Sequence, residues 1–188
     1  MKNDNTFAQT NAFAMQHGLW LGLMGIAAWA MWLWSFSMPA ASLLFWFLML
    51  GSWAGVVWLT WKFRKQMLTE RPTFSFGRGF AHAFLTSTYA ALWVAVAVFV
   101  YLAFFDHGYV FDQYEQFLKS PDMQQALQQS GMQARLDAMT EGKGTDVLVD
   151  ALRAISPANY AGMIIYLNFI FGTVLSLVAA LVCQKSKP

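Results

Sequence analysis

Three long stretches without a charged residue constrain this chain more than any other feature of its sequence. Residues 5–61, 79–105 and 154–184 contain no Asp, Glu, Lys or Arg. A membrane helix needs about 20 apolar residues, because it rises about 1.5 Å per residue across a hydrocarbon core of about 30 Å. The last two stretches each accommodate one such helix, and the first accommodates two. The pattern therefore predicts four membrane spans.

A turn divides the first stretch. Pro39 cannot donate a helical hydrogen bond, and it disfavours helical backbone in the residue before it. We therefore place the spans at 15–36, 41–61, 80–105 and 158–182. Only 12% of the residues are charged, whereas a soluble domain has about 25%. The composition thus excludes an ordinary soluble domain, and it favours an all-α integral membrane protein built as a four-helix bundle.

The segment between spans three and four, residues 106–157, is expected to form a helical insertion outside the membrane. Ser120-Pro121-Asp122 is typical of a helix start, with a cap, a proline in the first position and an acid in the first turn. Gly131 interrupts the helix that follows. We expect a short helical hairpin that lies on the membrane or covers the bundle. Its first helix would bury Met123, Leu127, Leu136 and Met139, and its second, capped by Thr145, would bury Val147, Leu148, Ala151, Leu152 and Ile155.

Loop charges predict the orientation. The loop 62–79 contains five basic residues and one acid, whereas the segment 106–157 contains eight acids and four bases. Lys and Arg accumulate in short cytoplasmic loops. We therefore expect a multi-pass membrane protein with both termini in the cytoplasm, residues 1–188 forming one membrane domain. The net charge of +2 is divided among loops that flank spans, which argues against nucleic-acid binding.

The beginning of the chain leaves one alternative open. The first span could be a signal peptide, because Pro39-Ala40-Ala41 is rich in small residues. However, Lys2 is offset by Asp4, so the leader has no basic region, and the apolar run is longer than in most signal peptides. Retention of the span is the favoured interpretation.

Glycines at helical spacing predict where the spans approach closely. Span one contains Gly18 and Gly22, with Gly25 one turn further on. In lipid, helices associate by close packing, and glycine lets their backbones touch. Span two contains Gly51 and Gly55 at the same spacing, and it is the natural partner of that face. Packing within the chain is favoured over dimerisation, although the motif serves both.

Eight of the nine tryptophans lie in spans one and two. Trp34 and Trp46 lie toward one membrane boundary, and Trp20, Trp58 and Trp61 toward the other. Tryptophan at the level of the headgroups keeps its ring buried and its N–H hydrated, so an aromatic belt is the favoured interpretation. A stacking surface for a lipid-linked sugar is the alternative.

Few polar side chains lie within the spans. His17 and His82 lie near the same ends of spans one and three, where they could meet as a pH-sensitive or metal-binding pair. Two histidines without a further ligand make a poor metal site, so no metal or other cofactor is expected. Thr86 and Tyr89 add polar groups to span three, although hydroxyls often bond to their own helix. Asn168 lies at mid-depth in span four and is expected to bond to a neighbouring helix.

Patterns of known catalytic sites are missing from the sequence. There is no phosphate-binding loop, no His-Glu-x-x-His and no nucleophile elbow. Asp112 and Glu115 lie on one helical face but are interpreted as solvated surface acids. Cys183 is the only cysteine, and it is expected to pack as a small apolar residue. The sequence therefore favours a protein that is not an enzyme.

The layout resembles the domain-of-unknown-function family 4199, small membrane proteins of Bacteroidota. The resemblance extends over nearly the whole chain, and it departs from the family in the tryptophan-rich first two spans. It implies a bacterial inner-membrane location and an association with glycosyltransferases that use polyprenyl phosphates, but no catalytic residue. The matching elements are His17-Gly18, the entry Ser75-Phe76-Gly77-Arg78-Gly79-Phe80 to span three, the Asp106 exit, Ser156-Pro157 and the Lys-Ser-Lys-Pro tail.

These observations favour a non-catalytic accessory or scaffold protein. Besides the lipid bilayer, its expected partner is another envelope membrane protein, such as a lipid-linked glycosyltransferase, or a second copy of the chain. The alternative is a small oligomeric transporter or lipid flippase, for which Asn168 and the polar start of span three are the only support. An enzyme that acts on lipid is the third and weakest hypothesis.

Overall fold

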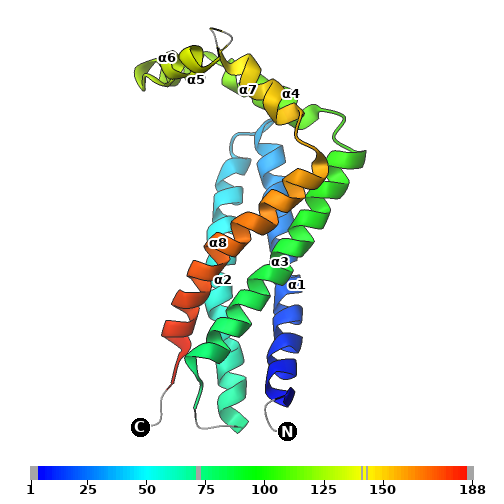
Figure 1. Cartoon of the computed structure of the whole chain (residues 1–188), viewed down its shortest axis with the longest axis vertical. Coiled ribbons are helices and arrows are strands. Elements are labelled where there is room, and N and C mark those ends of the chain that lie inside the picture. The colour runs from blue at the N-terminus through cyan, green and yellow to red at the C-terminus, as the bar shows by residue number, and fades with distance from the viewer. Residues whose placement is uncertain (1–3, 71–72, 141, 143, 186–188) are drawn as a thin grey trace.

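The computed structural model describes residues 4–70, 73–140, 142 and 144–185, and in these residues the chain is helical without any strand. Four long helices stand side by side and four short helices lie across one end (Figure 1). The all-α membrane fold expected from the sequence is confirmed. The long helices are α1 (Asp4–Ser35), α2 (Ala41–Glu70), α3 (Phe76–Phe104) and α8 (Pro157–Cys183), and the short ones are α4 (Tyr109–Leu118), α5 (Pro121–Gln129), α6 (Met132–Met139) and α7 (Gly144–Arg153).

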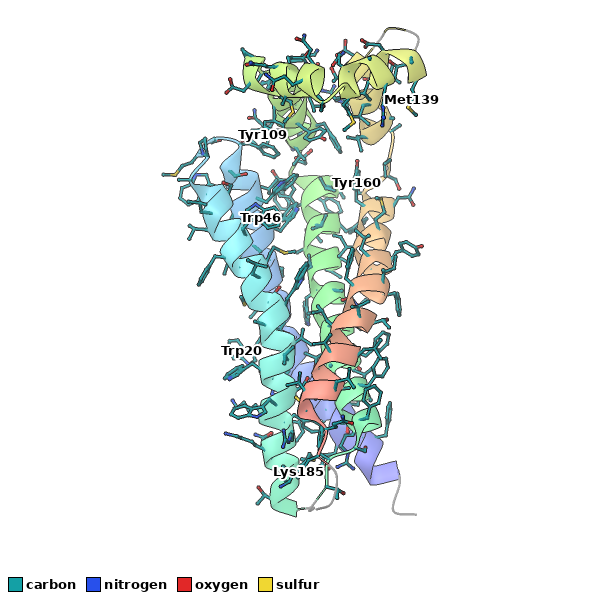
Figure 2. The ribbon with its side chains drawn as sticks, turned by 90° about the vertical axis from the view of Figure 1, so that its left-hand side faces the viewer. Trp20, Trp46, Tyr109, Met139, Tyr160 and Lys185 are labelled. Carbon is teal, nitrogen blue, oxygen red and sulfur yellow. The ribbon has the colours of Figure 1, made fainter. Side chains whose placement is uncertain are left out.

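Each long helix is long and apolar enough to cross a membrane. The start of α1 and the end of α8 lie at one end of the bundle, called the terminal end below, and α4–α7 lie at the other end (Figure 1). Large apolar side chains project outward from the bundle; Trp20, for example, is 69% exposed (Figure 2). Exposed apolar surface on this scale is stable in contact with lipid, which identifies a multi-pass membrane protein.

The middle of the bundle is built from small and branched residues of all four helices. Helix α3 packs against both α1 and α8, while α2 closes the bundle against α1 and α8. The central cluster consists of Leu21, Val56, Leu59, Ala83 and Ala179. Alanine on α3 and α8 permits close approach, which drives helix association where lipid removes the hydrophobic difference between protein and solvent.

The terminal end has a second cluster of different character. Phe63 and Met67 of α2 pack there with Phe74, which precedes α3, and with Cys183 at the end of α8. Phe74 and Lys185 also exchange two backbone hydrogen bonds, of 3.1 and 2.9 Å. These bonds hold the beginning of α3 against the end of α8. The buried Cys183 thus packs among apolar side chains, in accordance with its expected role.

The glycines of α1 face α3 and not α2, which corrects the pairing expected from the sequence. A Cβ atom at Gly18 would lie 2.5 Å from Cβ of Tyr89, and one at Gly22 would lie 2.7 Å from Cβ of Trp93. Gly25 meets Val94 of the same helix in the same way. Helices α1 and α3 run in the same direction, so the three contacts follow one another along the interface.

The glycines of α2 do face α1, but they receive large side chains instead of glycine. A Cβ atom at Gly51 would lie 2.6 Å from Cε of Met24, and one at Gly55 would lie 2.8 Å from Cδ2 of Leu21. Glycine spacing in the sequence therefore located the close contacts but not the partners. The reason is that a single glycine can be matched by a backbone or by a protruding side chain.

Helix starts follow the capping residues. Ser75, Ser120 and Ser156 each accept a hydrogen bond from the backbone N–H three residues ahead, and proline follows two of them in the first helical position. Asp106 begins α4 differently. Its buried carboxylate accepts hydrogen bonds from the N–H groups of Gly108 and Val110, at 3.1 and 3.0 Å. These bonds satisfy N–H groups that a helix start would otherwise leave unpaired.

The segment between α3 and α8 was expected to be a helical hairpin, but it consists of four short helices. We call this segment the arm (residues 109–153). Gly131 adopts a left-handed backbone conformation with φ of 67°, which divides the predicted first helix into α5 and α6. Met139 is 83% exposed, and Val149 is the apolar side chain that α7 buries. Residues expected to point inward from α7 but found exposed are Val147, Leu148 and Ala151.

Ion pairs join α4 to α7. One guanidinium nitrogen of Arg153 lies 2.7 Å from both Asp112 and Glu115, and Lys119 lies 2.7 Å from Glu115 and 3.0 Å from Asp146. Hydrogen bonds to Glu115 and Asp146 raise the pKa of Lys119. The two acids that the sequence indicated to be solvated are therefore partners of Arg153. Surface pairs contribute little one by one, but a shared network orients the helices that carry it.

Replacing Gly18 with alanine tests the α1–α3 contact. We expect Gly18→Ala to lower the free energy of unfolding by about 1–3 kcal/mol, because the added methyl group overlaps a Cβ atom and a backbone oxygen of α3. Gly162→Ala is the matched control, since a Cβ atom there meets nothing within 4 Å. Titration with a denaturing detergent, followed by circular dichroism, measures both. Equal stability of the two variants would contradict this packing.

Candidate functional site

A chain of hydrogen-bonded polar side chains crosses the interior of the bundle near the terminal end. Nδ1 of His17 on α1 lies 3.0 Å from Nε2 of His82 on α3, and Nδ1 of His82 lies 3.1 Å from the hydroxyl of Thr60 on α2. The structure thus brings the two histidines together, and it adds a threonine that sequence reasoning missed. A polar side chain at the end of the apolar span 41–61 was the signal that the sequence offered for Thr60.

Aromatic rings pack around these hydrogen-bonded side chains. The ring of His82 is stacked on Phe63, with centroids 4.3 Å apart and an interplanar angle of 10°. Phe13 contacts both Phe63 and His17. The side chains of His82 and Thr60 are fully buried. Burying a polar group costs free energy unless the group is hydrogen-bonded. The two hydrogen bonds of His82 therefore stabilise its imidazole in this buried position.

The single hydroxyl hydrogen of Thr60 determines how the protons are arranged. Thr60 lies 2.8 Å from the carbonyl of Val56, one turn earlier in its own helix. If it donates there, His82 donates from Nδ1 to Thr60, and His17 donates from Nδ1 to His82. If it donates to His82 instead, every bond reverses and His17 carries its hydrogen on Nε2. The chain therefore has two proton arrangements, which differ in what His17 presents at its other nitrogen.

His17 borders a cavity of about 590 Å³ between α1 and α2. Since Nδ1 is used toward His82, Nε2 is the nitrogen left for this cavity. Its wall also carries the amides of Gln16 and Gln66 and the ammonium group of Lys62. Nζ of Lys62 lies 5.6 Å from the ring centroid of Trp58, which lines the same cavity. The arrangement combines an ionisable ring, a cation and amides at a lipid-accessible position.

The side chains of His17, His82 and Thr60, called the histidine chain below, can hold a proton and form hydrogen bonds. At the inner end, Thr60 returns to a backbone carbonyl of its own helix, so the chain does not continue across the bundle. Among the described residues, no group of three His, Cys, Asp or Glu side chains is placed to hold a metal ion. Proton relays across membranes contain further ionisable groups. The histidine chain is therefore interpreted as a site that opens at His17, and not as a pathway across the bundle.

The remaining polar candidates lie elsewhere on α3. The hydroxyl of Tyr89 donates to the side chain of Asn11 on α1, at 2.7 Å. Thr86 is fully buried, and its hydroxyl makes no hydrogen bond to any described residue. Neither side chain joins the histidines. Ser87 and Thr88 bond to the carbonyl of Phe84 in their own helix, which is the ordinary role expected for hydroxyls at this position.

Asn168 was expected to bond to a neighbouring helix, but it makes no such bond to any residue that the structure describes. Its Nδ2 group is buried without a hydrogen-bond partner among the described residues. Its oxygen lies beside Gly172 of the same helix, where Ser87 of α3 also approaches; a Cβ atom at Gly172 would lie 2.9 Å from each oxygen. The missing side chain of Gly172 thus makes room for both polar groups. The family-like element Ser75, Phe76 and Gly77 is a helix start, since Ser75 caps α3.

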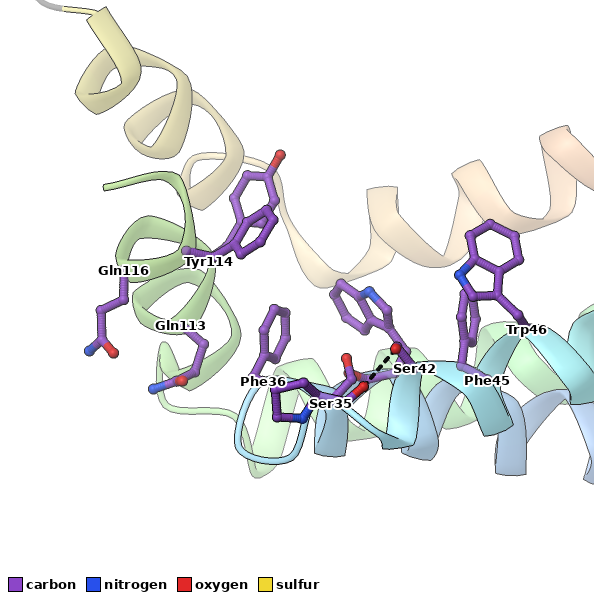
Figure 3. Close-up of a pocket in the computed structure, with 11 residues that line it drawn as sticks. Ser35, Phe36, Ser42, Phe45, Trp46, Gln113, Tyr114 and Gln116 are labelled. Carbon is purple, nitrogen blue, oxygen red and sulfur yellow. Dashed lines mark hydrogen bonds between the residues drawn. The ribbon is translucent and has the colours of Figure 1, made fainter. Parts of the chain in front are cut away.

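A second cavity of about 590 Å³ lies where the arm meets the α1–α2 turn (Figure 3). Phe36, Phe45 and Trp46 approach from the turn and its flanking helices, and Tyr114 approaches from α4. Gln113 and Gln116 supply the polar groups. The cavity is lined mostly by aromatic rings, which suits apolar side chains and lipid more than charged ligands. It contains no acidic residue among those that line it.

The comparison with known families agrees with this architecture. Residues 16–185 match the family model described as protein of unknown function (DUF4199). The chain belongs to this family. The match begins just before His17 and ends at the residue that pairs with Phe74, so it includes α1 from residue 16 onward, the other three long helices and the arm. The resemblance inferred from the sequence is confirmed.

No curated protein and no solved structure matches the chain. The DUF4199 description assigns no activity and no residue roles. The function therefore has to be argued from the geometry of the histidine chain, the two cavities and the arm.

Replacing Thr60 with valine tests the buried chain. Thr60→Val keeps the shape of the side chain but leaves Nδ1 of His82 without its partner, so we expect the free energy of unfolding to fall by about 1–3 kcal/mol. Thr88→Val is the control, because that hydroxyl bonds to a carbonyl of its own helix, and we expect a smaller loss of stability. The ¹⁵N resonances of the imidazoles should move in the first variant and not in the second. Unchanged His82 resonances would refute the bond.

Proposed function

We propose that the chain is a non-catalytic accessory subunit of the bacterial inner membrane that binds another envelope membrane protein through its arm. The carrying observation is the way in which the arm is held. Arg153 and Lys119 tie α4 to α7, while α5 and α6 extend sideways beyond the bundle (Figure 1). A segment that is oriented but leaves half its length off its own bundle is suited to contact a second protein.

The composition of α5 and α6 supports a protein partner over a lipid surface. The two helices bear five glutamines and one basic residue, Arg135. Helices that bind anionic membranes are rich in Lys and Arg. Met132 and Met139 are exposed on α6, and methionine adapts readily to the shape of a partner surface. The partner's surface is therefore expected to be apolar at its centre and polar at its rim.

The family points to one class of partner. The resemblance to the DUF4199 family implies an association with glycosyltransferases that use polyprenyl phosphates. The aromatic cavity beneath the arm supports this choice, because it lies at one end of the bundle, near the level at which a lipid-linked sugar would meet the protein. An arm that contacts the enzyme would place this cavity beside the enzyme's lipid substrate.

A small oligomeric transporter or lipid flippase is the second candidate. The observation that favours it is the histidine chain, because ionisable side chains inside a membrane mark substrate or proton pathways by default. The histidine chain ends at Thr60, which bonds to a carbonyl of its own helix α2. This ending disfavours a pathway through a single copy of the protein. Proteoliposomes that contain the purified chain and show no substrate-dependent flux would exclude transport by this protein alone.

Cysteine labelling tests the proposed orientation. Gln128→Cys on α5 is expected to react with an impermeant maleimide in intact cells, and Gln66→Cys at the terminal end is not, because positive loops stay in the cytoplasm. Both variants should react after lysis. Cys183 is buried, and the parent chain serves as the background control. The reverse pattern would overturn the orientation.

Charge substitutions on α6 test the partner interface. We expect the double variant Met132→Glu, Met139→Glu to lose a copurifying partner, because two carboxylates would be buried without counter-ions in the complex. The control is Gln125→Glu, Gln128→Glu, which adds the same charge to exposed polar positions of α5. Mass spectrometry of the tagged chain, extracted gently from its native membrane, provides the measurement.

Two outcomes would overturn the proposed function. One is a partner that remains stoichiometric after residues 112–155 are deleted. The other is a homo-oligomer without any second protein in the parent chain. Charging Gly18 or Gly22 is not a test of partner binding, since both glycines lie against α3 inside the bundle.

A further inference from the structure

The cavity that His17 borders has the features of a headgroup site. It lies between α1 and α2, and its wall contains one cation, two amides and one imidazole but no acid among the described residues. Above these polar groups the wall is apolar, with Leu21 and Met24 facing the glycines of α2. A polar end with a positive charge, continued by an apolar groove, matches the layout of a phospholipid better than that of a soluble anion.

We propose that this cavity binds the headgroup of an anionic phospholipid, with the Lys62 ammonium and the His17 imidazole as its recognition groups. The occupant is a lipid because α1 and α2 are both membrane-spanning at this level and the cavity is open along the bundle surface. Charge complementarity selects an anionic headgroup, since Lys62 has no acidic partner on the cavity wall. This site is independent of the arm, and hence of the proposed protein interface.

Lys62 is held in position for this role. Its ammonium group lies over the ring of Trp58, which also borders the cavity. A cation over an aromatic face is attracted by the ring while it keeps its N–H groups free to donate. Lys65 has the same arrangement over Trp61, at 3.6 Å, but neither of these two residues lines the cavity. The described part of the chain therefore contains two lysine–tryptophan pairs, of which one faces the site.

The histidine chain explains how His17 can donate a hydrogen bond to an anion. A phosphate oxygen requires an N–H donor, and a neutral His17 offers one at Nε2 only when the hydrogen bonds run from Thr60 through His82 to His17. In the opposite arrangement Nε2 is an acceptor, which would repel phosphate. Binding of the headgroup therefore selects one of the two proton arrangements. The buried bonds of His82 and Thr60 transmit this choice to the core of the bundle.

Lipid binding by the purified full chain tests the site. Native mass spectrometry of the chain in detergent counts bound phosphatidylglycerol and phosphatidylcholine across a concentration series. We expect one phosphatidylglycerol to bind at concentrations at which phosphatidylcholine does not. Lys62→Glu should weaken that binding about tenfold or more, since the substitution removes a charge-assisted hydrogen bond and adds a negative charge beside the headgroup. Lys65→Glu is the matched control and should leave the binding unchanged, because Lys65 lies outside the cavity.

The imidazole signals supply a second readout, which separates a site from general attraction. Phosphatidylglycerol should shift the ¹⁵N resonance of Nε2 of His17 to its protonated position in the parent chain and not in Lys62→Glu. Equal losses of lipid in the Lys62 and Lys65 variants would overturn the proposal, because they would indicate attraction to overall charge. So would equal affinity for phosphatidylcholine, or unchanged His17 resonances.

Inorganic phosphate distinguishes the two sources of a phosphate group. We expect millimolar phosphate to leave the bound phosphatidylglycerol in place, since it lacks the acyl chains that fill the apolar groove. Displacement of the lipid by inorganic phosphate alone would identify a site for soluble anions and overturn the lipid assignment. Loss of the protein partner does not enter these measurements, so the proposed function and this site fail separately.

Discussion

The close contact between α1 and α3 is the interaction on which the rest of the structure depends. In lipid, apolar side chains gain little by turning from the bilayer to another helix, so association relies on packing at short range. Gly18 and Gly22 supply that packing, because their missing side chains admit Tyr89 and Trp93 of α3. The same contact sets His17 beside His82. A packing device made of glycine therefore determines where the polar site of the bundle lies.

A polar chain inside an apolar bundle is stable only if each of its groups is satisfied. His82 has no access to solvent, and it relies on one helix at each nitrogen: α1 through His17 and α2 through Thr60. The bundle thus joins three helices by directional bonds at the level where Phe63 also stacks on the imidazole. This gives the terminal end a specific register that the apolar contacts alone would leave loosely defined.

The two ends of the molecule are held together by different interactions. At the terminal end, backbone pairing of Phe74 with Lys185 and a buried cluster draw the helices together. At the other end, Asp106 closes α3 by capping the next helix, and ion pairs orient the arm. The terminal end combines basic side chains with a groove open to lipid, whereas the arm presents polar helices beyond the bundle. Lipid and protein ligands are accordingly proposed for opposite ends.

The sequence by itself determined the fold class, the four spans and the helix start at Ser120, because charge gaps and capping residues act locally and a membrane helix satisfies its own backbone. It also indicated His17 and His82 as candidates. Only the tertiary structure decided which surfaces meet. It paired Gly18 with α3, buried Val149 and placed Thr60 and Lys62 beside the histidines. Helices that are apolar on all sides carry no periodic signal for their partners, so contacts between distant segments had to come from packing in three dimensions.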